Sequence, residues 1–151
     1  MSASSSSPAT LVCAQCGQAN RVPESRLGDG PVCGKCKQPL VSGKPIELTA
    51  ANFQKFISRT SLPVVVDFWA PWCGPCRQMA PQFASAADQL APGILLAKLD
   101  TDAHAAAAAP YQITGIPTMI LFHQGREVAR QSGAMSTAQI VQWVRQAAAA
   151  R

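Results

Sequence analysis

The sequence predicts an α/β protein in which helices cover both faces of a mixed β-sheet, preceded by a small cysteine-rich module. Three observations lead to this prediction. Short apolar runs rich in β-branched residues alternate with segments of helical periodicity through the middle of the chain. Two strand-like runs then meet at a tight turn before a last amphipathic segment. Near the N-terminus, by contrast, four cysteines stand among small and polar residues that offer little material for a core.

The middle of the chain is predicted to run strand, helix, strand, helix, strand, helix. The run VVVDFWA from Val64 is apolar and β-branched, so we expect a central strand buried on both faces. The helix after it should bend or break near Pro81, and the alanine-rich helix from Ala103 should stop before Pro110, because proline removes a helical hydrogen bond. The other expected elements are a strand at 46–48, a helix capped by Thr49 that places Phe53, Phe56 and Ile57 on one face, a helix over 73–90 and a strand from Ile94.

The last third of the chain changes pattern. TMILFHQG and REVARQSG are predicted to form a β-hairpin that turns at Gln124-Gly125, because both runs suit strands and the pair between them suits a tight turn. Residues 136–150 are predicted to form an amphipathic helix with Ile140, Val141 and Val144 on its apolar side. An antiparallel pair following parallel strands makes the sheet mixed.

Bulk composition fits a globular protein, at 48% hydrophobic and 14% charged residues. We find no apolar run near the roughly 18 residues of a membrane-spanning helix, and MSASSSSPAT lacks the features of a secretory signal, so we expect a cytoplasmic protein. The net charge of +5 is concentrated in residues 1–44, which carry +3. Nucleic acid is nevertheless not expected as a partner, because that segment has no aromatic side chain on which a base could stack.

The composition shifts near Gly43-Lys44-Pro45, which divides the chain. We expect residues 1–10 to be a disordered Ser-rich tail, residues 11–42 a four-cysteine module, residues 43–45 a linker and residues 46–151 the main domain. Since residues 11–42 contain few large apolar groups, we expect them to bury little and to fold only with a bound metal.

The motif WCGPC directly follows the predicted central strand and opens a helix. Cys73 is therefore placed where free backbone N–H groups and the helix dipole favour a thiolate, and we predict that it is the nucleophile of a redox pair. Cys76 lies one turn later, so it can resolve a mixed disulfide. A zinc half-site is the alternative, but only His104 and His123 could complete it, and both are interpreted as surface histidines.

The other two pairs, CAQC from Cys13 and CGKC from Cys33, are separated by sixteen residues. This spacing is typical of a zinc site, in which Cys13, Cys16, Cys33 and Cys36 would hold one ion. Two labile disulfides or an iron site are the alternatives. Gly17 and Gly34 allow the tight backbone turns that such a site needs.

An acid within the apolar run VVVDFW lies either at the end of the sheet or in the interior with a raised pKa, which makes Asp67 a candidate catalytic residue. Lys98 is predicted in the neighbouring strand and can tune the proton affinity of Asp67. The alternative for Lys98 is a side chain that extends from a strand end to solvent.

The segments VVVDFWAPWCGPCRQMAP, KLDTD, YQITGIPTMILFHQGREV and the pair Gly133-Ala134 resemble thioredoxin, and with CAQCGQANRVP and PVCGKC the chain is similar to the zinc-binding bacterial thioredoxins. The resemblance implies a thioredoxin fold, protein-disulfide reductase activity and regeneration by an NADPH-dependent thioredoxin reductase. It implies that Asp67 lies behind Cys76 as its proton acceptor. It also implies a cis bond before Pro117 and substrate contacts from Trp72, Gly74, Pro75, Ile116, Pro117 and Gly133.

Two other classes of function are compatible with the four-cysteine module. It could be an adaptor that brings the redox domain to a partner, and a salt-sensitive complex that requires residues 11–42 would indicate this. It could also be a redox sensor or holdase whose thiolates oxidise and release zinc, which metal release by mild oxidant would indicate.

Overall fold

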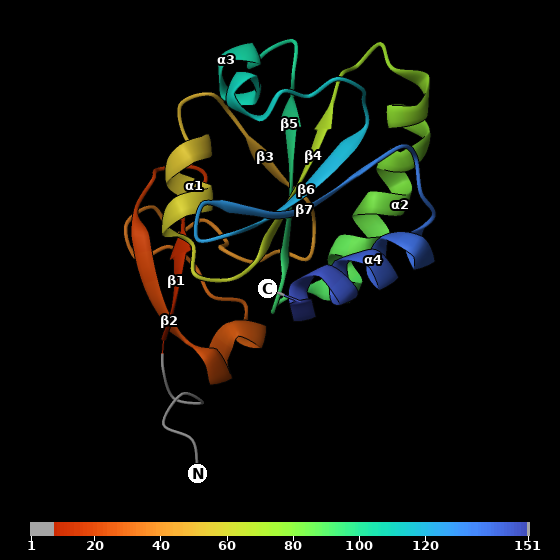
Figure 1. Ribbon diagram of the computed structural model, residues 1–151. Helices are drawn as coiled ribbons and strands as arrows, with labels where there is room; N and C mark the ends of the chain where they lie inside the picture. The colour runs from red at the N-terminus through yellow and green to blue at the C-terminus, as the bar shows by residue number, and fades with distance from the viewer. Residues whose placement is uncertain (1–7, 151) are drawn as a thin grey trace.

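The computed structural model describes residues 8–150, and its centre is a five-stranded sheet (Figure 1). The strand order is β3-β5-β4-β6-β7. β3, β5 and β4 are parallel, whereas β6 and β7 run antiparallel to their neighbours, so the predicted mixed sheet is confirmed. The strands are β3 (Ile46–Leu48), β4 (Val64–Trp69), β5 (Leu95–Asp100), β6 (Thr118–His123) and β7 (Arg126–Ser132).

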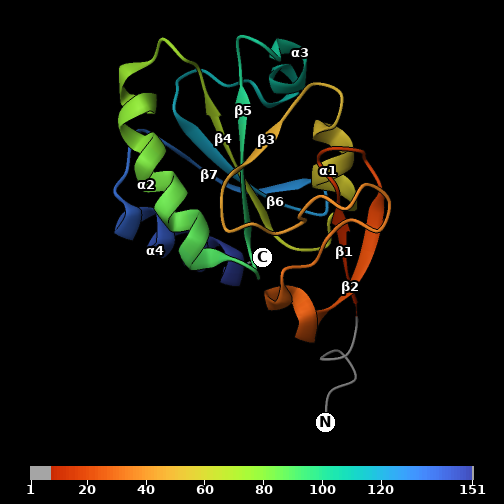
Figure 2. The same cartoon turned by 180° about the vertical axis from the view of Figure 1, so that it is seen from behind.

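Helices cover both faces of this sheet, as Figures 1 and 2 show from opposite sides. The helices α1 (Phe53–Arg59) and α3 (Ala105–Ala108) pack on one face, and α2 (Gly74–Leu90) and α4 (Thr137–Ala150) on the other. In β4, Val64, Val66 and Phe68 point to the α1 face. Val65 belongs to the core beneath α2 and α4, so Asp67, two residues further, points to that same face.

Prolines and caps shift some helix bounds from those expected. Pro81 lies inside α2, which continues past it to Leu90 without interruption. The alanine-rich helix is only four residues long, and Pro110 is part of the 3₁₀ turn that follows it, Ala109–Tyr111. α1 begins at Phe53, because residues 50–52 first form a turn in which the Thr49 hydroxyl accepts a hydrogen bond from the N–H of Asn52.

The N-terminal cysteine-rich module is a small antiparallel hairpin, β1 (Pro8–Val12) and β2 (Ala19–Pro23), followed by a 3₁₀ turn, Glu24–Asp29. We call residues 8–42 the ribbon. The expected disordered tail of residues 1–10 is wrong for its last three residues, which belong to β1. They are ordered because each pairs with a residue of β2 and because Ala9 is buried. Residues 1–7 lie outside the described part of the chain.

The ribbon shares its core with the main domain, contrary to the expectation that residues 11–42 bury little. Leu11, Val12 and Leu40 are buried in the same apolar cluster as Phe56 of α1 and Leu48 of β3. The apolar side chains of the ribbon are few, but the main domain supplies the surface against which they pack. The expectation failed because sequence composition alone does not reveal this partner surface.

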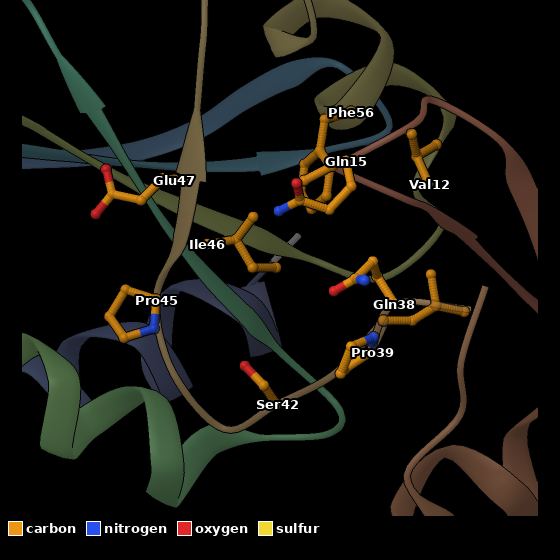
Figure 3. Close-up of a pocket in the computed structure, with 11 residues that line it drawn as sticks. Val12, Gln15, Gln38, Pro39, Ser42, Pro45, Ile46, Glu47 and Phe56 are labelled. Carbon is orange, nitrogen blue, oxygen red and sulfur yellow. The ribbon is translucent and has the colours of Figure 1, made fainter. Parts of the chain in front are cut away.

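Hydrogen bonds tie the same interface together. The Ser61 hydroxyl accepts from the N–H of Thr10 at 2.8 Å, and the Ser61 N–H donates to the Thr10 carbonyl at 2.9 Å. The Asn52 side-chain amide donates to the carbonyl of Ala14, beside the first cysteine pair, at 3.0 Å. A cavity of about 290 Å³ remains between the ribbon and β3, and in Figure 3 Ile46 points into it while Glu47 points away on the other side of the strand.

Within residues 8–150, every helix is too short or too polar to cross a membrane.

Candidate functional site

The first cysteine pair to consider stands where β4 ends and α2 begins. Cys73 is the N-cap of α2, with an extended backbone, and Cys76 lies in the first turn of the helix. This arrangement follows from the sequence, because Pro75 is well suited to the first turn of a helix, where its missing N–H has no partner to lose. The two cysteines form a disulfide with their Cα atoms 5.2 Å apart.

The sulfur of Cys73 has a polar environment on one side. The backbone N–H of Cys76 donates to it at 3.2 Å, and the carbonyl oxygen of Ile116 lies 3.7 Å away. Both sulfur-bearing residues are buried, with Cys73 4% exposed and Cys76 2% exposed. A helix N-terminus that donates an N–H to the sulfur stabilises a thiolate at Cys73.

An open groove of about 490 Å³ passes beside Cys73. Its walls include Trp72, which is 67% exposed, and the backbone before the cis peptide bond of Ile116-Pro117. The groove is thus apolar, accessible and adjacent to the sulfur that would react. It is lined by Trp72, Cys73, Gly74 and Pro75 from one side and by Ile113, Thr114, Gly115 and Ile116 from the other.

Four of the six residues expected to contact substrate therefore line this groove. Pro117 is buried, and Gly133 is exposed and donates its backbone N–H to the carbonyl of Pro117 at 2.9 Å. Ile113, Thr114 and Gly115 were missed by the sequence analysis. They directly precede Ile116 and Pro117 in the sequence, which could have suggested them, because residues next to a turn that faces the cysteines share its surface.

Asp67 lies in β4 with its side chain 1% exposed, and its Oδ1 has no hydrogen-bond partner among residues 8–150. Burial raises the pKa of Asp67 from 3.8 to about 7, with the negative charge of Glu47 adding to the effect and the positive charge of Lys98 opposing it. The carboxyl group is on the sheet face that α2 covers, and α2 carries Cys76 in its first turn. A buried acid of this kind can exchange a proton near neutral pH.

Lys98 is the register partner of Asp67 on β5. Its ammonium lies 4.4 Å from the centre of the Trp69 ring, a cation–π contact, and the side chain is half-buried. The sequence predicts Lys98 in the strand beside that of Asp67, and β5 places it at the register position next to Asp67.

The other four cysteines converge at the end of the ribbon. The Sγ atoms of Cys13, Cys16, Cys33 and Cys36 all lie within 4.8 Å of one another, and none of these residues forms a disulfide. The Sγ atoms of Cys13 and Cys36 are 3.5 Å apart, and those of Cys16 and Cys33 are 3.6 Å apart. Four thiolates around a tetrahedral zinc ion, with metal–sulfur distances of about 2.3 Å, stand about 3.8 Å from one another. The donor set and its spacing fit zinc.

Both halves of this cluster use the same backbone turn, which we call a knuckle. In the first, the Cys13 N–H donates to the carbonyl of Gln18 and the Gly17 N–H donates to the carbonyl of Cys13. The second repeats the pattern with Cys33, Lys37 and Gln38. Gly17 has φ of 82° and Lys37 has φ of 69°, so each knuckle turns through a left-handed residue. The Asn20 side chain accepts from the N–H of Gly34 at 2.9 Å and joins the two.

Among the described residues, the four-cysteine cluster contains neither histidine. His104 is more than the surface residue we expected, since its Nδ1 accepts a hydrogen bond from the N–H of Ala50 at 3.0 Å and joins the start of α3 to the turn before α1. His123 is half-buried at the end of β6. The sequence carries no signal for the His104 contact, because its two partners are 54 residues apart.

Comparison with known proteins agrees with this geometry. The family model described as Thioredoxin matches residues 44–146, and the one described as Thioredoxin 2, N-terminal matches residues 12–38. Thioredoxin C-3 of Corynebacterium nephridii is 48% identical over 136 residues, which are 90% of this chain and 93% of that protein. Thioredoxin of Mycobacterium bovis is 41% identical and covers 64% of this chain and 83% of its own. The bifunctional thioredoxin reductase/thioredoxin of Mycobacterium leprae is 41% identical over 66% of this chain and 22% of its own length.

Proposed function

The chain belongs to the thioredoxin family and is a thiol–disulfide oxidoreductase with an N-terminal zinc-ribbon segment, and from this premise we propose which of its atoms carry out the reduction of protein disulfides. Cys73 is the attacking sulfur. The observation that carries this assignment is the N–H of Cys76, which donates to the Sγ of Cys73 at the start of α2 and favours the thiolate there.

The reaction proceeds in two exchanges. The Cys73 thiolate attacks one sulfur of the client disulfide, forms a mixed disulfide and releases the other client sulfur as a thiolate. Cys76 then loses its proton and attacks the Sγ of Cys73. The bond between Cys73 and Cys76 forms, the bond to the client breaks, and two electrons have passed from the protein dithiol to the client.

Asp67 is the proton acceptor for Cys76 in the second exchange. Its pKa of about 7 supports this role, because the carboxylate is present at neutral pH and is basic enough to take a proton from a thiol. Its burial on the face of the sheet beneath α2 is consistent with access to the interior cysteine rather than to solvent. Lys98 assists by stabilising the carboxylate from the neighbouring strand.

The groove beside Cys73 receives an extended segment of the client. Trp72, Gly74 and Pro75 form one side, and the backbone of Ile116 on the other side offers hydrogen bonds to the client strand. Pro117 holds that backbone in place from behind, and the N–H of Gly133 fixes Pro117 in turn.

One zinc ion held by Cys13, Cys16, Cys33 and Cys36 completes the ribbon, and its role is to stabilise this segment. The N–H of Cys36 is the main cause that lowers the pKa of Cys33 to about 6, so at least one ligand is ready to bind as a thiolate. We propose that residues 11–42 and 46–151 are the two functional units, and that an NADPH-dependent thioredoxin reductase restores the dithiol. Four free cysteines within one site favour the reducing cytoplasm as the location.

Trapping of mixed disulfides tests the division of roles between the two sulfurs. With Cys76→Ser, attack by Cys73 still occurs but no thiol resolves the intermediate, so client proteins should accumulate as covalent adducts. With Cys73→Ser, adducts should be absent. Non-reducing gels of both variants with a defined disulfide client measure this, and added reductant should dissolve the adducts. Adducts on the Cys73→Ser protein alone would reverse the assignment.

A further inference from the structure

Three charged side chains form a row across the parallel half of the sheet. Glu47 on β3 is the register partner of Lys98 on β5, and Lys98 is the register partner of Asp67 on β4. Register partners on adjacent strands project from the same face, about 4.8 Å apart in the direction across the sheet. The row leads from Glu47, which is exposed at the sheet edge, through the half-buried Lys98 to the buried Asp67.

The row lies on the face of the sheet that α2 covers, and α2 carries Cys76. Figure 3 shows Ile46 pointing toward the ribbon and Glu47 pointing away from it, in agreement with the alternation of side chains along a strand. Val65 and Leu96, two residues before Asp67 and Lys98, both pack in the core beneath α2 and α4. Glu47 is thus on the same face as the acid that we assign to Cys76.

Few other charges influence Asp67. β6 places the apolar Met119 opposite it, and α2 buries Cys76, Met79 and Phe83 toward the same face. The ionisable groups around Asp67 are therefore Lys98 from β5, Glu47 from β3 and the sulfur of Cys76 from α2.

The single positive charge of Lys98 interacts with two carboxyl groups, those of Glu47 and Asp67. A negative charge at Glu47 attracts the ammonium toward the sheet edge and repels a second negative charge at Asp67, and both effects disfavour the Asp67 carboxylate. The ammonium of the half-buried Lys98 lies over the Trp69 ring, and this contact restricts the positions that it can take. The charge on Glu47 consequently affects the pKa of Asp67, a buried group two strands away.

We propose that Glu47 is a positioning residue for the redox reaction, which acts through Lys98 to set the pH at which Asp67 can accept the proton of Cys76. This inference rests on the proposed role of Asp67. Its consequence is that a residue at the edge of the sheet, outside the groove that binds clients, determines how fast mixed disulfides are resolved in mildly acidic solution.

The test is a pH titration of the Asp67 carboxyl carbon by NMR in the oxidised full-length protein, with Glu47→Gln compared with the parent. Removal of the charge should lower the midpoint by about 0.5 pH units, as expected for two charges about 10 Å apart in a partly solvated site. Glu24→Gln is the matched control, since Glu24 is an exposed glutamate of the ribbon outside the row. In a Lys98→Gln background the effect of Glu47→Gln should be smaller, because the competition for the ammonium is gone.

The rate at which mixed disulfides are resolved should change as the lower pKa of Asp67 predicts. The acid limb of the pH profile for resolution of the mixed disulfide should move to lower pH, so that at pH 6 resolution becomes up to about threefold faster in Glu47→Gln. If the midpoint of Asp67 moves no more than in Glu24→Gln while Asp67→Asn slows resolution, the inference about Glu47 is wrong and the role of Asp67 stands. If the midpoint moves but Asp67→Asn resolves at the parental rate, the role of Asp67 is wrong and Glu47 has no catalytic part.

Discussion

After Cys76 the chain continues into α2, whereas after Cys16 and Cys36 it turns through a left-handed residue, Gly17 or Lys37. Both backbones separate their cysteines by two residues. The N–H of the second cysteine reaches the first sulfur both at Cys73/Cys76 and at Cys33/Cys36. In the helix the pair closes on itself as a disulfide. In the knuckles the N–H of the first cysteine donates to the carbonyl of a glutamine, and the four sulfurs meet across two turns. The residues that surround a CxxC pair, rather than its spacing, therefore decide between redox and metal chemistry.

The largest effect should come from exchanging a metal ligand. Cys33→Ser removes one of four thiolates, and the zinc content should fall from one ion per chain to near zero, with loss of ribbon structure, because metal binding supplies much of the folding free energy of such small segments. Metal analysis and circular dichroism measure this. The double variant Cys73→Ser/Cys76→Ser is the control and should retain its zinc. Loss of zinc in that control would contradict the separation of the two sites.

The second effect concerns the acid beneath the redox pair. Because the pKa of Asp67 is raised from 3.8 to about 7, the folded protein binds a proton more tightly than the unfolded chain, so stability decreases as pH rises from about 4 to about 7. At pH 8, Asp67→Asn should be more stable than the parent by up to about 4 kcal/mol, and at pH 4 the two should be nearly equal. Urea unfolding of the oxidised proteins at both pH values checks this. A pH-independent difference would show that burial of the charge is not the cause.

The third effect tests how firmly the ribbon is joined to the main domain. Leu11 is 1% exposed within the cluster that also holds Phe56, so Leu11→Ala should lower the free energy of unfolding of the main domain by about 3 kcal/mol. Val32→Ala, at a ribbon position that is 50% exposed, is the control and should change stability little. Tryptophan fluorescence during unfolding reports on the main domain, which contains all three tryptophans. An unchanged main-domain transition would mean that the two parts unfold independently.

The smallest effect separates the two knuckles. Gly17 takes positive φ without strain, and an added Cβ would meet only Lys55 Nζ at 3.7 Å, so Gly17→Ala introduces backbone strain of about 1 kcal/mol. Lys37 already carries that strain, and Lys37→Gly should relieve it. Competition with a zinc chelator should show about fivefold weaker binding for the first variant and equal or tighter binding for the second. Changes of the same sign in both would contradict the equivalence of the knuckles.

Much of the fold could be predicted, because local patterns specify it. The apolar run of β4, the hairpin turn at Gln124-Gly125 and the start of α2 all follow from short stretches of sequence. The four-cysteine spacing likewise predicted a convergence that the structure contains. These features depend on residues close together in the chain, or on chemistry so specific that only one arrangement satisfies it.

The remainder depends on contacts between distant segments. Three such features are the common core cluster of Leu11 and Phe56, the hydrogen bond from Ala50 to His104 and the alignment of Glu47 with Lys98. The sequence shows that Glu47 lies between Ile46 and Leu48, so that its side chain points to the opposite face of the strand. Strand order and register decide which charged residue lies next to it. The length of α3 was also misjudged, since alanine favours a helix wherever the ends of the segment do not forbid it.

The reciprocal hydrogen bonds between Thr10 and Ser61, together with the amide of Asn52, limit how freely the ribbon can be transplanted. Fusing residues 8–42 to another thioredoxin would transfer the metal ligands but only one partner of each of these hydrogen bonds. The recipient would need a hydroxyl at the position of Ser61, an amide at that of Asn52 and an aromatic ring at that of Phe56 before the graft could dock. The docking site of the ribbon is thus formed by α1 and by the residues on either side of that helix.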